Sequence, residues 1–167
     1  MALMMPKPEA EILANRDRLI NRLRDILPPD SVIDDEVGRR AYECDALTMY
    51  RQLPLVVVLP ETVAQVSAVM ALAHEMNVKV VPRGSGTSLS GGSLPLGDGI
   101  LLGLSKFNKV LEVDYPNRCA RVQPGVTNLA ISLAVAVNGF FYAPDPSSQF
   151  ACSFGGNGGE ISGGVHC

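Results

Sequence analysis

The stretch LVVVLPETVAQVSAVMALAHEMNVKVVPRGSGTSLSGGS, residues 55–93, decides the fold class. It begins with an uninterrupted apolar run, residues 55–59, which is typical of a strand covered on both faces. Thr62 and Gln65 form a capping-box pattern, after which apolar residues recur at helical spacing up to Met76. A second apolar run, residues 78–81, follows at once. This order predicts a βαβ unit with parallel strands and a right-handed crossover.

The segments on either side also alternate between helix and strand patterns. Residues 9–27 place their apolar side chains on one helical stripe, which predicts an amphipathic leading helix ended by Pro28 and Pro29. Mixed charges on its polar face favour packing against the body over a membrane-surface or partner-binding role. The other expected elements are strands at residues 99–104, 110–113 and 118–122, a helix at 128–137 capped by Thr127 and ended by Asn138 and Gly139, and an extended segment at 140–143.

The composition excludes several classes of protein. Of the 167 residues, 47% are hydrophobic and 19% are charged, which suits one globular domain and not a disordered chain. The net charge of −3 provides no general attraction to nucleic acid. No apolar run approaches the roughly 20 residues of a membrane span, and the charged N-terminus does not resemble a secretory signal. The cysteines, which form no C-x-x-C pair, favour a reducing cytoplasm and isolated thiols: Cys44, Cys119, Cys152 and Cys167.

The segment after the second strand of the βαβ unit carries the most informative chemistry. Residues 82–93 are rich in glycine, serine and threonine, and such segments bind phosphate through bare backbone amides and hydroxyl donors. The segment fits neither of two common nucleotide motifs. The dinucleotide fingerprint requires glycine in place of Leu89, and the P-loop requires lysine in place of Gly92. Phosphate binding and a long flexible turn therefore both remain open on composition alone.

Two later stretches favour the binding interpretation. Residues 144–148, Pro-Asp-Pro-Ser-Ser, form a rigid turn with hydroxyls, and residues 152–166 are a second glycine-rich run. Three such loops in one small domain suggest an extended ligand.

Several motifs in this order resemble the FAD-binding domain of the vanillyl-alcohol oxidase and p-cresol methylhydroxylase type. Within that group they are most similar to the FAD-linked subunit of glycolate oxidase and to D-lactate dehydrogenases. The resemblance covers roughly residues 30–167. The motifs that carry it are residues 42–45, 55–60, 83–87, 89–92, 122–126, 142–148, 155–157 and 162–167.

The resemblance implies an α+β, two-subdomain FAD-binding fold of the p-cresol methylhydroxylase type, beginning with the βαβ unit and truncated at its C-terminus. The implied organisation is a leading helix at 1–29, then an incomplete FAD-binding domain at 30–167, with a first subdomain at about 30–83 and the start of a second at about 84–167. The implied cofactor contacts are Arg83, Gly84, Ser85, Gly86, Thr87, Ser88, Leu89, Ser93, Pro144, Asp145, Ser147, Ser148, Gly155, Gly156, Asn157, Gly163 and Gly164.

The chemistry of particular residues refines this site. FAD is expected to bind without a covalent link, because Thr87 stands where some relatives carry an attachment histidine. Arg83 either contributes charge to the phosphates or forms a salt bridge beneath the loop. His166 is expected in a hydrogen-bonding role and not as a catalytic base, and Cys152 and Cys167 as small fillers. No catalytic residue and no metal ligand is identified.

The chain departs from the family pattern in two places. Residues 158–161, Gly-Gly-Glu-Ile, replace Val-Ala-Glu-Asn, so Ile161 removes an amide and the glycines raise the entropic cost of ordering the segment. The chain also stops at Cys167, whereas relatives continue into further FAD contacts and a substrate domain. A fragment that is inactive alone is therefore expected.

The expected function is the FAD-binding portion of a flavin-dependent oxidoreductase that oxidises a small 2-hydroxy acid, glycolate or D-lactate, by hydride transfer to FAD. Other oxidase subunits or an electron carrier are the expected partners, with no nucleic acid and no membrane span. The expected location is the cytoplasm, with attachment to the inner membrane through partner subunits as an option. One alternative is a non-catalytic remnant or interaction module with weak or no FAD binding. Another is a cell-wall precursor reductase on the same fold, against which the Pro-Asp-Pro-Ser-Ser stretch argues.

Overall fold

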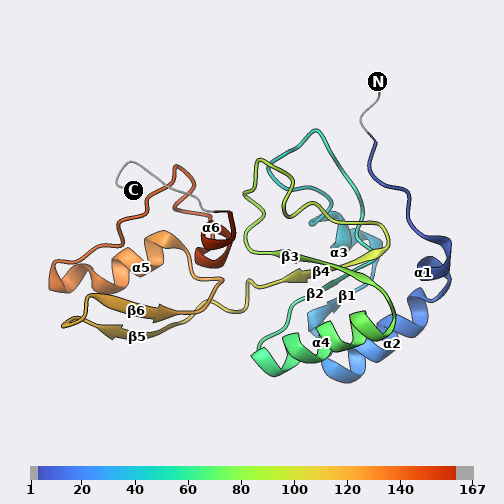
Figure 1. Cartoon of the computed structure of the whole chain (residues 1–167), viewed down its shortest axis with the longest axis horizontal. Coiled ribbons are helices and arrows are strands. Elements are labelled where there is room, and N and C mark those ends of the chain that lie inside the picture. The colour runs from blue at the N-terminus through green and yellow to red at the C-terminus, as the bar shows by residue number, and fades with distance from the viewer. Residues whose placement is uncertain (1–3, 161–167) are drawn as a thin grey trace.

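The computed structural model describes residues 4–160, and the chain forms two parts that lie side by side (Figure 1). The first part contains a four-stranded sheet covered by helices, and the second contains a two-stranded hairpin with a helix above it. Within residues 4–160, no helix combines the length and apolar character that crossing a bilayer requires.

The N-terminal segment forms two short helices where one was expected. Helix α1 (Ala10–Ala14) and helix α2 (Arg16–Ile26) are separated at Asn15, whose side-chain amide donates to the carbonyl of Glu11 at 3.0 Å. Their apolar stripe is buried in the core, with Leu19 and Leu23 at 1% and 0% exposure. The prediction that this segment packs against the body is confirmed.

The sheet of the first part has the strand order β1-β2-β4-β3. Strands β2 and β3 both pair in parallel with β4, so the predicted parallel βαβ unit is confirmed, although β4 separates its two strands. Strand β1 pairs with β2 in the antiparallel direction. The strand bounds are β1 (Val32–Ile33), β2 (Val56–Val58), β3 (Lys79–Arg83) and β4 (Gly99–Gly103).

Helix α4 (Val63–Glu75) makes the connection from β2 to β3 and forms the core with α2. It begins at the predicted capping box, in which the Thr62 hydroxyl accepts from the Gln65 amide at 3.2 Å while the Gln65 side chain accepts from the Thr62 amide. Its residues Val69, Leu72 and Ala73 are buried against the sheet. Residues 55–58 of the apolar run are buried as expected, because β2 is covered on both faces, whereas Leu59 is partly exposed. The remaining elements of this part are the short 3-10 helix η1 (Pro29–Ser31) and the short helix α3 (Glu36–Arg40).

The second part is built on an antiparallel hairpin of β5 (Val110–Asp114) and β6 (Cys119–Val122). Helix α5 (Asn128–Val135) follows, with the predicted Thr127 cap accepting from the Ala130 amide at 3.2 Å. A 3-10 turn, η2 (Ala136–Asn138), extends it, and Gly139 ends it in the left-handed region at φ 75°. Residues 140–143, which were expected to be extended, form no strand.

The glycine-rich run at the C-terminal end differs most from expectation. Residues expected as a loop form helix α6 (Phe154–Glu160) instead. Figure 1 shows α6 between α5 and the connection that follows β3. The expected division at residues 83 and 84 also differs from the observed sheet pairing. Strand β4 belongs to the first sheet, so the change from one sheet to the other comes between β4 and β5.

Candidate functional site

A cleft of about 330 Å³ lies where the connection between β3 and β4 faces helix α6. Sequence-predicted residues from three separated segments line it together. They are Arg83, Gly84, Ser85, Gly86, Thr87, Ser88, Ser93, Ser148, Gly155, Gly156 and Asn157. The three glycine- and serine-rich stretches therefore share one cleft, as the extended-ligand interpretation requires.

Other predicted contacts are not among the residues that line this cleft. Leu89 points to solvent with 74% of its surface exposed. Pro144, Asp145 and Ser147 belong to the predicted turn, of which Ser148 alone lines the cleft. Gly163 and Gly164 lie outside the described residues, as do Ile161, His166 and Cys167.

Several lining residues were missed by the sequence analysis. Ser153 and Pro124 line the cleft, and so do Gly92, Gly159 and Glu160. Ser153 directly precedes the helical glycine run, and Pro124 stands in the Val-Gln-Pro-Gly-Val motif, so adjacency to family motifs was the available signal.

Two close approaches shape the loop wall of the cleft. A Cβ atom on Gly84 would lie 1.9 Å from Oγ of Ser153, so the loop and the start of α6 are in close contact and a side chain at position 84 would displace Ser153. Gly86 has a φ of +72°, in the left-handed region, and its Cα faces the Arg83 guanidinium, which a Cβ would meet at 2.3 Å. Buried Ser88 then closes a turn by accepting from the amides of Ser90 at 3.2 Å and Gly92 at 3.3 Å.

Arg83 lies beneath the loop and also lines the cleft. Its Nη1 donates to the carbonyl of Tyr42 at 3.3 Å, and its guanidinium stacks over the Tyr42 ring at 5.7 Å from the centroid. The salt bridge offered as an alternative is absent among residues 4–160, where Arg83 forms no ion pair with a carboxylate. Burial lowers the pKa of Arg83, and the negative charge of Asp45 opposes that effect. A cation is thus held at the base of the cleft.

The opposite wall is fixed by backbone contacts at the start of α6. The amide of Phe154 donates to the carbonyl of Val126 at 2.7 Å, and the amide of Gly155 donates to that of Pro124 at 2.8 Å. A Cβ on Gly155 would lie 2.6 Å from Cβ of Pro124, so this contact also requires glycine. The Pro-Gly-Val motif of residues 124–126 therefore anchors the helix that forms this wall.

A buried amide pair connects this wall to the turn at residues 144–148. Nδ2 of Asn157 donates to Oδ1 of Asn128 at 2.6 Å and to Sγ of Cys152 at 3.2 Å. Nδ2 of Asn128 in turn donates to the carbonyl of Pro144 at 3.0 Å. Asn157 and Pro144 are thus joined through Asn128, and Cys152 is buried with 1% exposure.

A second hollow of about 410 Å³ shares Gly84, Ser85 and Ser153 with the first and reaches Asn108 and Thr127. The lining of both hollows is rich in glycine and hydroxyl side chains. Two adjoining hollows of this kind suit a long ligand with a diphosphate better than a compact one.

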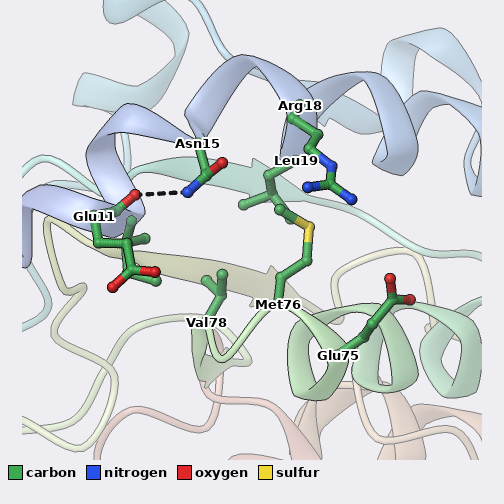
Figure 2. A pocket seen from close by; sticks show the side chains of 8 residues that line it. Glu11, Asn15, Arg18, Leu19, Glu75, Met76 and Val78 are labelled. Atoms are coloured by element: carbon green, nitrogen blue, oxygen red, sulfur yellow. Dashed lines mark hydrogen bonds between the residues drawn. The ribbon is translucent and has the colours of Figure 1, made fainter.

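A separate hollow of about 170 Å³ lies at the break between α1 and α2 (Figure 2). Figure 2 shows Asn15 and Arg18 on one side, facing Glu75 and Met76 from the end of α4. Its lining contains no glycine and combines charges of both signs, so it lacks the phosphate-binding character of the cleft. Among residues 4–160, no group of three or more His, Cys, Asp or Glu side chains is arranged as metal ligands are.

The family model described as the FAD binding domain matches residues 54–167. The chain therefore belongs to the family of FAD-binding domains, and FAD is its cofactor. The matched range includes both walls of the cleft.

Curated relatives include oxidoreductase subunits. The glycolate oxidase subunit GlcD of Escherichia coli K12 is 50% identical over 153 residues, which make up 92% of this chain and 31% of the relative. A D-lactate dehydrogenase of Anaerostipes hadrus is 31% identical over 148 residues, 88% of this chain and 31% of the relative. The chain thus spans under a third of the length of these relatives.

Solved structures confirm the α+β fold of the p-cresol methylhydroxylase type. An alkyldihydroxyacetonephosphate synthase superposes with a TM-score of 0.77 at 23% identity, covering 93% of this chain and 30% of the other. A substrate-bound p-cresol methylhydroxylase superposes with a TM-score of 0.65 at 21% identity, covering 83% of this chain and 28% of the other. At these identities the likeness concerns the fold alone.

Proposed function

We propose that the cleft between the β3–β4 connection and α6 holds the diphosphate of FAD. One observation carries this proposal: three segments far apart in the sequence line one cleft. Each segment is rich in bare backbone and hydroxyl donors, and a half-buried arginine lies at the base of the cleft. A diphosphate needs many donors at short range, and glycine permits the close approach of backbone amides.

The residues present fit such a group. Gly84 and Gly155 have no side chain, so their backbone is bare and the walls approach closely there. Ser85, Ser148 and Ser153 add hydroxyls. We assign the diphosphate to residues 84–88 and Ser93. We assign the remainder of FAD to the part of the cleft beside Ser148, Gly155 and Gly156. Thr87 offers no nucleophile of the kind that attaches flavins, so the binding is non-covalent.

In the longer protein, we propose, this domain serves an oxidoreductase that acts on a small 2-hydroxy acid such as glycolate or D-lactate. The identity of 50% to a glycolate oxidase subunit supports this assignment. FAD supplies the hydride acceptor, and the residues described here bind and orient it. Further oxidase subunits or an electron carrier complete the reaction. The described residues contain no assigned substrate clamp, so catalysis is assigned to the longer protein.

Flavin retention by the purified 167-residue chain tests the cofactor proposal. FAD is added, excess is removed, and the retained absorbance and the quenching of flavin fluorescence are measured. Gly84→Ala should weaken retention because its new methyl group displaces Ser153, whereas Gly158→Ala, which meets no atom within 4 Å, should retain FAD. Absence of retention by the unaltered chain would support the alternative of a non-catalytic remnant.

The activity proposal needs the longer protein. Glycolate-dependent and D-lactate-dependent reduction of a dye would be measured with a protein of the full length of the relatives that contains this domain. Failure with both acids, in a protein that retains FAD, would contradict the substrate class and leave the cofactor assignment standing.

A further inference from the structure

Residues 42–47 form a support beneath the loop that lines the cleft, although Asp45 is not among the residues lining it. The segment follows α3 and has no regular secondary structure. Asp45 is almost completely buried, with 4% of its surface exposed. A buried carboxylate is unfavourable unless it is hydrogen-bonded, so its partners indicate what it stabilises.

Both carboxylate oxygens of Asp45 are engaged. Oδ1 accepts from the amide of Leu47 at 2.9 Å, which fixes the turn of its own segment. Oδ2 accepts from the hydroxyl of Ser93 at 3.4 Å, at the far end of the glycine-rich loop. Asp45 thus connects two segments 48 residues apart in the sequence.

The neighbours of Asp45 hold the near end of the same loop. The amide of Ala46 donates to the carbonyl of Gly86 at 3.0 Å. The Tyr42 carbonyl accepts from Arg83, whose guanidinium packs against Gly86. Both ends of the loop therefore rest on one short segment, and the negative charge of Asp45 favours the charged form of Arg83.

We propose that Asp45 is a positioning residue for the cofactor loop. It fixes the distance between Ser93 and the turn at Gly86. At this distance the hydrogen-bond donors of the loop all point to the diphosphate. The inference rests on the proposed function of the cleft. It predicts that Asp45 governs affinity for the diphosphate-bearing cofactor and not for the flavin ring.

The test compares Asp45→Asn with Asp98→Asn in the 167-residue chain. Asp98 is a matched control because it is equally buried, at 4%, and hydrogen-bonds to Lys79 and to the Glu9 amide away from the cleft. Fluorescence titrations give Kd for FAD and for riboflavin, which lacks phosphate. Asp45→Asn should raise Kd for FAD about tenfold or more and leave Kd for riboflavin within about twofold, whereas Asp98→Asn should change neither.

Hydrogen exchange provides a second measurement that does not depend on flavin. In Asp45→Asn and in the milder Ser93→Ala, the amides of Ser90 and Gly92 should exchange faster than in the unaltered chain and in Asp98→Asn. An unchanged Kd for FAD in Asp45→Asn, or equal weakening of FAD and riboflavin, would overturn the inference. Absence of FAD binding by the unaltered chain would instead overturn the proposed function, and this inference with it.

Discussion

The two parts of the molecule bury their strands to very different extents. In the first part, every residue of β2 and β4 is buried, and the sheet, α2 and α4 share one core. In the second part, β5 and β6 have no fully buried residue. The large apolar side chains exposed in the second part are Leu111, Leu133, Val137, Phe140, Phe141 and Phe150.

This difference shows where the stability of the site comes from. An isolated two-stranded hairpin is marginal in water, whereas a sheet covered by helices on a shared core is stable by itself. The cleft has one wall on each part: the β3–β4 connection belongs to the first, and α6 is anchored to residues 124–126 of the second. The loop wall is therefore expected to be rigid, and the α6 wall is expected to unfold more easily.

The largest effect is expected from removing a core side chain of the first part. Leu23→Ala should lower the free energy of unfolding by about 3 kcal/mol, because Leu23 is 0% exposed and its loss leaves a cavity. Leu133→Ala, at 64% exposure on α5, should change it by less than about 0.5 kcal/mol. Urea unfolding of both variants measures the contrast. An equal loss in Leu133→Ala would mean that this side chain is packed as closely as Leu23.

Two glycines of α6 should respond in opposite directions. Gly155→Ala should destabilise the chain by about 1–3 kcal/mol, because the added methyl group meets Pro124 at 2.6 Å. Gly158→Ala should stabilise it by up to about 1 kcal/mol, because alanine favours the helix and the position faces open space. Thermal unfolding reports both changes. Stabilisation by Gly155→Ala would show that α6 is not packed against residues 124–126.

An acid-sensitive contact belongs to the first part. Burial alone would raise the pKa of the Asp98 carboxyl, but hydrogen bonds from Lys79 and from the Glu9 amide outweigh burial and hold this pKa below its ordinary value. The stabilisation is therefore complete above the unfolded-state pKa and is lost as the pH falls below about 4. Asp98→Asn should lower the free energy of unfolding by about 1 kcal/mol at pH 7. It should also weaken the loss of this free energy as the pH falls into the acid range. An unchanged pH profile of unfolding in this variant would contradict the assignment.

The smallest effect concerns the charge of the α6 wall. Glu160 reaches toward Gly92, where a Cβ would meet its Oε1 at 3.1 Å, so a carboxylate faces the loop assigned to the diphosphate. Glu160→Gln should tighten FAD binding about two- to fivefold at low salt, and less at high salt. Glu112→Gln, on the exposed hairpin, is the matched control and should leave the affinity unchanged. Weaker binding by Glu160→Gln would show that the carboxylate accepts a hydrogen bond from the ligand instead.

Local patterns made elements of both parts predictable. In the first part these are the capping box of Thr62 and Gln65 and the buried run at residues 55–58, and in the second part the Thr127 cap. Each depends on neighbours within a few residues, and each is observed. The insertion of β4 between β2 and β3 depends on long-range pairing that no local signal encodes. The helical state of residues 154–160 was missed because glycine disfavours helices. Contacts with Pro124 and Val126 override that preference.

The site was predictable as a set of segments but not residue by residue. Glycine and serine content indicated which stretches converge, and the loop at residues 84–88 lines the cleft throughout. Sequence patterns do not predict the direction in which a loop side chain points. Leu89 points to solvent, and Asp145 does not line the cleft. Ser153 was missed because its role arises from contact with Gly84, 69 positions earlier in the chain.

The position of β4 in the sheet has a consequence for synthesis of the chain. Strand β4 is the last of the three parallel strands to leave the ribosome, yet it lies between the other two. Until residue 103 has emerged, β2 and β3 lack their shared partner, and their backbone edges are open to association with other nascent chains. The loop of residues 84–98 is also tethered at one end only during that interval. The loop wall of the cofactor cleft can therefore form only after β4 has been translated, and the α6 wall follows later.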